Sequence, residues 1–445
     1  MNEENQLPSA DLPEQIRQLE AIGVEMIETE RHADAERIFR EIARVSPRHV
    51  SALQYLGNRA MQSGALEEAQ ELYERAVYAA PGMAAIHQQL GLVLSARGYP
   101  DGALRAFDTV IRLEPAFASG WILRGAVLQE LGRREEAVAM YQQAETLCSD
   151  LLEFALARSG LSGMHQQILQ ASHHLAYTRS TAVKEALERL QARGLSTPTE
   201  RVAAAIRHMC RQEPAAYANA QQHPAYAYVP GLGERPLFAD GKFPWADRLE
   251  RRTGAICNEF HALLDAGLEP TSNPEKDGLH PAAAFYLYFH GRRTSEITPR
   301  CPQTIAELNA LPLLAKLPGQ APEASFSILP PRARLAPRTG IANYKLKLLL
   351  PLSGASGGTL RVDDRSHPLT DGKSVLYDDC YEHEIRNRGE TELVMLLADL
   401  WHPGLTGSEV KTLTAAHWTL EHLRSKLDAV IRAAPGSSSG VNGRI

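Results

Sequence analysis

The sequence predicts a multidomain protein of the α + β class, in which an N-terminal α-solenoid is followed by a double-stranded β-helix, or jelly-roll, domain. Three observations support this prediction. The first third of the chain repeats with a period of 34 residues, residues 152–222 continue with helical periodicity, and short strand-like runs between turns begin near residue 323. A chain of 445 residues is long enough for two or three domains with separate cores.

Residues 16–151 divide into four repeats of 34 residues. The eighth position of each repeat is glycine, the twentieth is alanine, and the position four residues later is Phe or Tyr. A small residue at the eighth and twentieth positions allows the two helices of a hairpin to approach closely. Proline ends the second helix in three of the repeats. This pattern resembles the tetratricopeptide repeat. The repeated residues are Gly23, Gly57, Gly91 and Gly125, then Ala35, Ala69, Ala103 and Ala137, then Phe39, Tyr73, Phe107 and Tyr141.

The resemblance implies a stack of helical hairpins with a concave face. Two interpretations of this face remain open, namely a spacer that supports the neighbouring domain and a groove for a peptide or protein partner. Residues 1–15 are expected to be a flexible N-terminus, and residues 152–222 a helical connector. The sequence does not identify the partner.

The C-terminal half is expected to contain one β domain over residues 223–408. It begins with an irregular segment rich in Pro, Gly and aromatic residues and a helix over residues 243–267. Residues 409–433 are expected to form a C-terminal helix, and residues 434–445 a disordered tail. Short antiparallel strands are predicted at 325–329, 344–352, 359–362, 374–378, 383–387 and 393–401.

Several motifs of this domain resemble the aspartyl/asparaginyl β-hydroxylase family. They occur in the family's order over roughly residues 226–406, and they include YVPGLGERPLF, FSILPP, RTGIANYKLKLLLPL, YDDCYEHEI and ADLWHPGL. The resemblance implies a jelly-roll dioxygenase that hydroxylates the β-carbon of Asp or Asn in peptides. It also implies Fe(II) and 2-oxoglutarate as cofactors.

The resemblance implies two histidine ligands for the iron. His383 in YEHE matches the second ligand, whereas the position of the first is occupied by Arg338 in PRTG. A guanidinium group has five donors and no lone pair for a metal, so Arg338 cannot replace a histidine ligand. The local candidates for a substitute ligand are His402, Asp378 and Asp379.

The resemblance also implies a site for 2-oxoglutarate. Ser327 matches the serine of that site, and Lys347 stands where an arginine is expected. Leu349 replaces a histidine, and Leu393 replaces the arginine that faces the distal carboxylate. These leucines remove the main partners of a dicarboxylate and are expected to fill the barrel interior with apolar side chains.

Two functions therefore remain open, and no catalytic residue is assigned. The first is an aspartyl/asparaginyl β-hydroxylase-like enzyme with a repeat module for a partner. The second is a degenerate pseudo-hydroxylase that binds a peptide or protein. Arg338 and Arg361, with Lys347, are candidates for an anion-binding patch, while Arg338 paired with Asp378 or Asp379 is the simpler structural interpretation.

The composition excludes several other classes. A net charge of −6 and a pI near 6.3 provide no general attraction to nucleic acid or to an anionic membrane. No apolar run approaches the length of a membrane span. The five scattered cysteines indicate reduced thiols, and the expected location is the cytoplasm.

Overall fold

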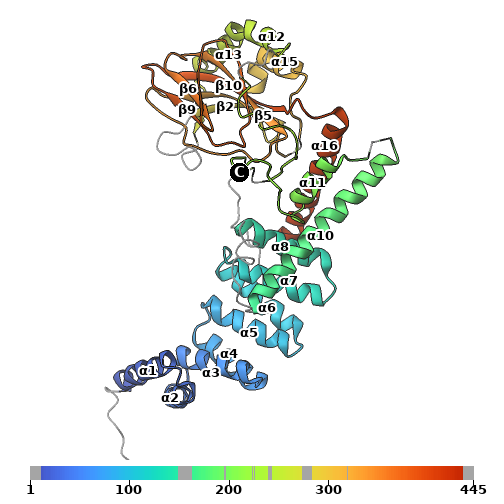
Figure 1. Cartoon of the computed structure of the whole chain (residues 1–445). Coiled ribbons are helices and arrows are strands. Elements are labelled where there is room, and N and C mark those ends of the chain that lie inside the picture. The colour runs from blue at the N-terminus through green and yellow to red at the C-terminus, as the bar shows by residue number, and fades with distance from the viewer. Residues whose placement is uncertain are drawn as a thin grey trace, which may run out of the picture. The chain divides into compact units, whose positions relative to one another are not determined.

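The computed structural model describes residues 12–148, 163–194, 197–222, 224, 226–238, 243–272, 283–317 and 319–433 (Figure 1). The predictions for residues 1–11, 152–162 and 434–445 lie outside these residues. The chain divides into two compact units. One consists of Met1–Leu175 with Arg424–Ile445, and the other of Ala176–Leu423.

The first unit is a helical solenoid, as the repeat pattern predicts. Its helices follow one another as antiparallel pairs, α1 with α2 up to α7 with α8, and each pair packs on the next (Figure 1). None of the described helices combines the length and the apolar composition that a membrane span requires. The helices are α1 Leu12–Glu28, α2 His32–Val45, α3 Val50–Ser63, α4 Leu66–Ala79, α5 Ala84–Ala96, α6 Pro100–Leu113, α7 Ala118–Glu130 and α8 Arg134–Leu147.

The repeated glycines face the repeated aromatic rings. A Cβ atom built on Gly57 would lie 2.8 Å from Cζ of Tyr73, and one built on Gly91 would lie 2.6 Å from Cε1 of Phe107. Both rings are buried. Because real Cβ atoms do not approach other atoms this closely, glycine is what allows the ring of the second helix to pack against the backbone of the first. The same pairing occurs in the first and fourth repeats.

Two further helices cover the last repeat within the first unit. The rings of Tyr141 on α8 and His174 on α10 (Gly163–Gln191) have centroids 6.4 Å apart. The final residues of α16 (Gly407–Ala433) also reach α8, where the Gln142 amide donates to Asp428 at 2.9 Å. These contacts contribute to the burial of the middle of α8, the last helix of the four repeats.

The second unit contains two antiparallel sheets, as predicted. The larger has the order β1-β2-β4-β10-β5-β8, with β3 added to β2, and the smaller has the order β7-β6-β9. The six predicted strands lie within two residues of observed ones, whereas β1, β2, β3 and β7 were not predicted. The strands are β1 Thr271–Ser272, β2 Ala283–Phe289, β3 Arg292–Arg293, β4 Ala324–Leu329, β5 Lys345–Ser353, β6 Gly358–Val362, β7 Arg365–Pro368, β8 Val375–Tyr377, β9 His383–Asn387 and β10 Leu393–Trp401.

The larger sheet separates two apolar cores. Alternate residues of β10, such as Leu396 and Ala398, face a core shared with the helices α13 (Thr253–Asp265) and α15 (Pro302–Ala310). The residues between them, such as Leu393 and Met395, face a second core that includes Leu360 of the smaller sheet. The space between the two sheets is therefore filled by side chains from both. The predicted helix over 243–267 is divided at Arg252 into α12 (Ala246–Arg251) and α13.

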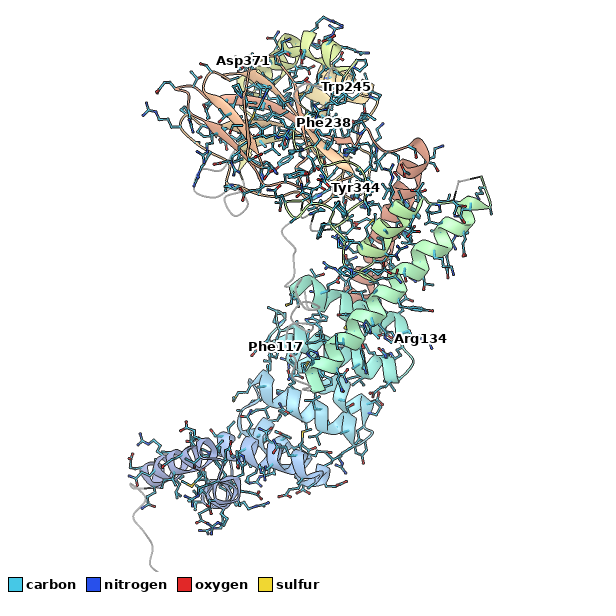
Figure 2. The ribbon with its side chains drawn as sticks, in the orientation of Figure 1. Phe117, Arg134, Phe238, Trp245, Tyr344 and Asp371 are labelled. Carbon is cyan, nitrogen blue, oxygen red and sulfur yellow. The ribbon has the colours of Figure 1, made fainter. Side chains whose placement is uncertain are left out.

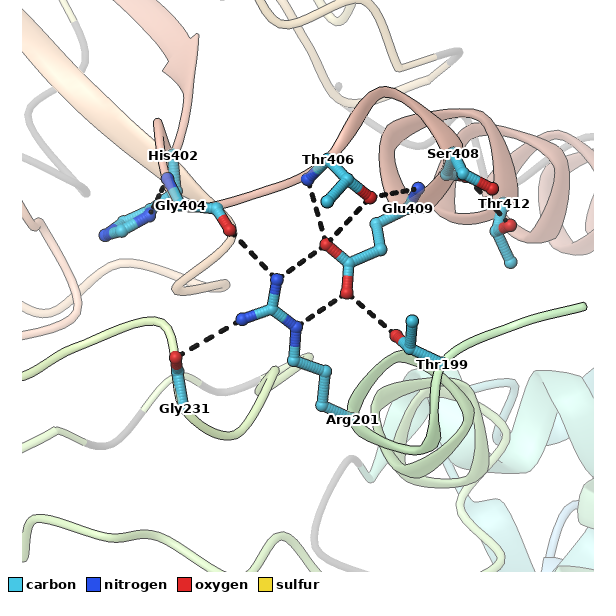
Figure 3. Close-up of polar contacts among 9 residues, drawn as sticks. All are labelled: Thr199, Arg201, Gly231, His402, Gly404, Thr406, Ser408, Glu409 and Thr412. Carbon is cyan, nitrogen blue, oxygen red and sulfur yellow. Dashed lines mark hydrogen bonds and ion pairs between the residues drawn. The ribbon is translucent and has the colours of Figure 1, made fainter. Parts of the chain in front are cut away.

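An ion pair to the buried carboxylate of Glu409 joins α11 (Glu200–Met209) to the start of α16 within the second unit (Figure 3). Nε and Nη2 of Arg201 lie 2.6 Å from the two carboxylate oxygens of Glu409. The hydroxyl of Thr199 and the amide of Thr406 donate to the same carboxylate at 2.8 and 2.9 Å. Because Thr199 and Arg201 belong to the connector and Thr406 to the segment before α16, this one carboxylate holds the connector against the segment that follows β10.

Candidate functional site of the β domain

His383 begins strand β9 and is buried inside the domain. Its Nδ1 lies 3.1 Å from the carbonyl oxygen of Tyr381, and its ring centroid lies 5.3 Å from that of Tyr377. Burial lowers the pKa of His383 below its usual value because the charged imidazolium would lose its hydration. The ring is therefore neutral at pH 7, which is the state in which an imidazole nitrogen binds a metal.

Arg338 lies directly opposite His383 in an antiparallel bridge. The amide of Arg338 donates to the carbonyl of His383 at 3.1 Å, and the amide of His383 donates back at 2.9 Å. Residues paired in this way carry their side chains on the same face. The two positions at which the hydroxylase resemblance expects iron ligands are therefore neighbours, and one of them carries a guanidinium group.

The segment before Arg338 contains one residue more than the part of β9 with which it pairs. Arg334 bridges to Arg386 on β9, and four steps along the chain then lead to Arg338. On β9, only three steps separate Arg386 from His383. The pairing therefore changes register by one residue between the two bridges, and the second bridge leaves Arg338 on the face that carries His383.

The residues near His383 do not fit an iron site of the expected kind. Arg338 has no lone pair to donate, and its fixed charge repels a dication. Among the residues that the structure describes, one group of three acidic, thiol or imidazole side chains has ligand atoms within 4.8 Å of one another. It consists of Asp378, Asp379 and Cys380 and does not include His383.

Both carboxylate oxygens of Asp378 accept hydrogen bonds from the chain itself. Its Oδ2 accepts a hydrogen bond from the Gln222 side chain at 2.5 Å, and its Oδ1 accepts one from the amide of Cys380 at 2.9 Å. Burial raises the pKa of Asp378 to about 7. Both oxygens already have partners, so Asp378 is poorly suited to replace the missing ligand.

His402 lies just beyond the end of β10 and is also buried. Its Nδ1 accepts a hydrogen bond from the amide of Gly404 at 3.0 Å (Figure 3). Its ring meets the edge of Phe238, which Figure 2 labels, at a centroid distance of 5.9 Å. Burial, together with the charge of Arg201, lowers the pKa of His402 to about 4. One ring nitrogen therefore supports the local turn, and no ligand group that includes His402 occurs among the described residues.

Lys347 is paired with a carboxylate of the chain itself. It lies opposite Asp399 in the pairing of β5 with β10, and its Nζ is 2.5 Å from Oδ1 of Asp399. Nζ of Lys345 lies 3.4 Å from the same oxygen. Burial opposes all three charges, but their attraction prevails, so the pKa of Lys347 is raised and that of Asp399 falls to about 2. Lys347 is thus not a solvated surface lysine.

The other positions expected to hold 2-oxoglutarate lie in an apolar environment. Leu349 and Leu393 have no exposed surface, and both belong with Met395 to the core between the sheets. Ser327 on β4 is paired with Met395 and is buried as well. A dicarboxylate at this place would lose its hydration without gaining an arginine at position 393, at a cost of several kcal/mol. The residues present therefore do not fit 2-oxoglutarate.

Arg361 does not join the other basic side chains of the predicted patch. It is paired with Glu384, the residue after His383, so its side chain lies on the opposite face of the smaller sheet. Its Nη2 lies 2.7 Å from a carboxylate oxygen of Glu382. The structure thus brings Arg338 together with His383 but separates Arg361 from both.

Two buried carboxylates of this region, Asp399 and Glu384, were missed at the sequence level. Asp399 is the single charged residue in the run LVMLLADLW, and an acid in an otherwise apolar strand is itself a signal of a buried partner. Glu384 stands next to His383 in YEHEIRN, where the hydroxylase resemblance implies a role for the histidine only.

The comparison with family models confirms both resemblances that the sequence motifs indicate. Residues 24–84 and 89–151 match a model described as a tetratricopeptide repeat. Residues 250–403 match a model described as aspartyl/asparaginyl beta-hydroxylase. Tetratricopeptide repeats are therefore followed in this chain by an aspartyl/asparaginyl β-hydroxylase domain.

Curated relatives match less than half of this chain. Human aspartate beta-hydroxylase domain-containing protein 1 is 28% identical over 43% of this chain and 51% of the relative. Human aspartyl/asparaginyl beta-hydroxylase is 26% identical over 42% of this chain and 25% of the relative. An ornithine lipid ester-linked acyl 2-hydroxylase of Rhizobium tropici is 28% identical over 39% of this chain and 62% of the relative. The chain spans less than two thirds of each of these proteins.

Solved structures match the helical repeats. A crystal structure of MamA is 19% identical, with a TM-score of 0.29, and the match covers 37% of this chain and 97% of that one. YrrB, described as a tetratricopeptide repeat protein with an unusual peptide-binding site, is 14% identical, with a TM-score of 0.28, over 38% of this chain and 91% of that one.

Proposed function

We propose that this chain, in which tetratricopeptide repeats precede an aspartyl/asparaginyl β-hydroxylase domain, is a pseudo-hydroxylase that binds a peptide or protein partner without iron-dependent turnover. The observation that carries the proposal is the bridge between Arg338 and His383. The bridge supports the proposal because a cationic side chain stands opposite His383, at the position where the first histidine ligand is expected.

The co-substrate side supports the same proposal independently. Leu349 and Leu393 are packed in the core between the sheets, and Lys347 is held by Asp399. Restoring one ligand would therefore not by itself restore a place for a dicarboxylate. The domain keeps a well-packed barrel, which is what a binding scaffold requires.

The repeats supply the binding part of the proposal. Stacked helical hairpins present an extended concave surface, and such surfaces commonly bind peptides or protein segments. A protein or peptide partner is therefore the class of ligand that these repeats favour over a small molecule.

An active hydroxylase is the second candidate, and one observation favours it. His383 is buried, and its lowered pKa favours the neutral imidazole that binds a metal. The relatives are named both for aspartyl or asparaginyl hydroxylation and for lipid acyl hydroxylation. For an active enzyme, therefore, peptide and acyl substrates would both have to be assayed.

The deciding experiment is an anaerobic calorimetric titration of the full chain with Fe(II), with and without 2-oxoglutarate. We expect no saturable iron binding by the unaltered protein. The variants are Arg338→His, which supplies the missing imidazole, and the triple variant Arg338→His/Leu349→His/Leu393→Arg, which also supplies the co-substrate partners. Arg300→His serves as the matched control, because Arg300 is an exposed residue of the 3₁₀ turn η1 (Thr298–Arg300).

Each outcome distinguishes the candidates. Iron binding gained in Arg338→His but absent from Arg300→His supports a site closed by one residue. Micromolar iron binding by the unaltered protein, with 2-oxoglutarate turnover measured as succinate release, would instead favour the active enzyme.

A further inference from the structure

The smaller sheet and the segment beside it are rich in arginine. Residues 331–338, 358–368 and 383–388 contain seven arginines, three carboxylates and no lysine, whereas the whole chain has a net charge of −6. This part of an acidic protein is therefore locally basic. The seven are Arg332, Arg334, Arg338, Arg361, Arg365, Arg386 and Arg388.

Three of these arginines converge on one buried carboxylate. The side chain of Glu384 has no exposed surface. Its carboxylate oxygens lie 2.8 Å from Nε of Arg386, 3.5 Å from Nε of Arg361 and 3.6 Å from Nη1 of Arg334.

The pairing of the strands places these residues on one face. Arg386 lies opposite Thr359 on β6 and is bridged on its other side to Arg334. Arg361 lies opposite Glu384 in the adjacent row. Because His383 alternates with Glu384, this face is the one directed away from the core between the sheets. We call Thr359, Arg334, Arg361 and Arg386 the outer arginine face.

The outer arginine face holds more positive charge than Glu384 neutralises. Arg361 also pairs with Glu382 at 2.7 Å. For Arg334 and Arg386, Glu384 is the one ion-pair partner within the described part of the chain. Their side chains are 62% and 41% exposed, which leaves N–H donors accessible to a ligand.

We propose that the outer arginine face binds an acidic segment of a protein partner. Guanidinium groups recognise carboxylates through paired N–H donors, and the buried Glu384 holds three of them in place before a ligand arrives. Less side-chain entropy is therefore lost on binding. Glu382 limits the basic area on one side, which suits a few carboxylates better than a long phosphate backbone. The surface depends neither on iron nor on the repeats.

The test is fluorescence anisotropy with a labelled oligoglutamate peptide and the full chain at low salt. A glycine–serine peptide of the same length is the uncharged reference. We expect saturable binding of oligoglutamate that weakens as salt rises. In Arg334→Gln/Arg386→Gln, we expect the dissociation constant to rise by about tenfold or more, as for lost charge-assisted contacts. Arg300→Gln, which removes an exposed arginine elsewhere, should bind like the unaltered chain.

A single variant guards against loss of the fold. Arg334→Gln removes the arginine that lies farthest from Glu384 and is the most exposed of the three. The variant should therefore have the same free energy of unfolding as the unaltered chain and still bind oligoglutamate several-fold more weakly. Equal binding by all variants would overturn the proposal. The proposal would also be overturned if oligoglutamate did not bind, while inorganic phosphate bound to the unaltered chain and no longer bound to the double variant. Because the readout is peptide binding, failure of this proposal can be distinguished from failure of the proposed function, which the iron titration tests.

Discussion

Lys347 and Asp399 face each other across strands β5 and β10, and the lysine amine lies 2.5 Å from the aspartate carboxylate. Lys345 approaches the same carboxylate, and the amide of Glu323 donates to its other oxygen at 3.0 Å. A residue position that the hydroxylase resemblance links to a co-substrate is therefore part of an internal charge network. Each member of such a network depends on the others, because the side chain of Asp399 has no exposed surface and those of Lys345 and Lys347 are only 7% and 16% exposed.

The first prediction is that Asp399→Asn destabilises the second unit strongly. The substitution leaves Lys345 and Lys347 buried without a negative charge, and breaking a buried pair in this way costs about 3–5 kcal/mol. Urea unfolding followed by circular dichroism measures the loss. Asp364→Asn, at an exposed turn position, is the control and should stay within about 0.5 kcal/mol of the unaltered chain. A small effect of Asp399→Asn would mean that water reaches the pair.

The second prediction concerns acid. Hydrogen bonds from Arg201 lower the pKa of Glu409 to about 2, from an ordinary value of 4.5. A lowered carboxyl pKa stabilises the fold at pH values above the unfolded pKa, and this contribution disappears as pH falls from about 5 to about 2. Glu409→Gln should therefore cost about 3 kcal/mol at pH 7 and little near pH 2. Urea unfolding across this pH range checks it, and a pH-independent difference would contradict the assigned ion pair.

The third prediction has the opposite sign. Burial raises the pKa of Asp378 to about 7, from an ordinary value of 3.8. The folded chain therefore holds a proton that the unfolded chain releases, and stability is lost as pH rises from about 4 through 7. Asp378→Asn keeps a neutral side chain beside Gln222, so its stability relative to the unaltered chain should improve by at least about 1 kcal/mol between pH 5 and pH 8. Parallel stability curves for the two proteins would show that Asp378 is ionised throughout.

The fourth prediction concerns the repeats. Gly91→Ala places a methyl group against the buried ring of Phe107, and overpacking of this kind costs about 1–3 kcal/mol although alanine is the better helix former. Thermal unfolding measures it. Gly82→Ala is the matched control, because a Cβ there meets no atom within 4 Å. If both variants behaved alike, the close contact between glycine and ring would not limit the repeat sequence.

The repeats could be predicted well because their information is local and recurs. Glycine, alanine and an aromatic residue at fixed spacing define each hairpin, and the neighbouring hairpin follows the same rule. Strand β5 was predictable for a similar reason, since KLKLLLPL alternates before it becomes apolar. Strand β2 was not predictable, because its buried and partly buried residues do not alternate along the chain. Strand β7 was not predictable either, because RSHP is a short, exposed and polar edge strand.

The candidate site was only partly predictable. Motif order placed Arg338 and His383 together, and the bridge between them agrees with that placement. The partner of Lys347 lies 52 residues away along the chain, so it depends on a strand register that no local pattern reveals. The same applies to Glu384, whose arginines come from three separate segments.

The bridge between Arg338 and His383 also has a genetic consequence. Both of its hydrogen bonds join backbone amides to backbone carbonyls, so they do not depend on the side chain at position 338. Arginine and histidine codons can differ by a single base. The backbone therefore holds position 338 opposite His383 whatever side chain it carries, and where the arginine codon is CGU or CGC, a single base change would place an imidazole there.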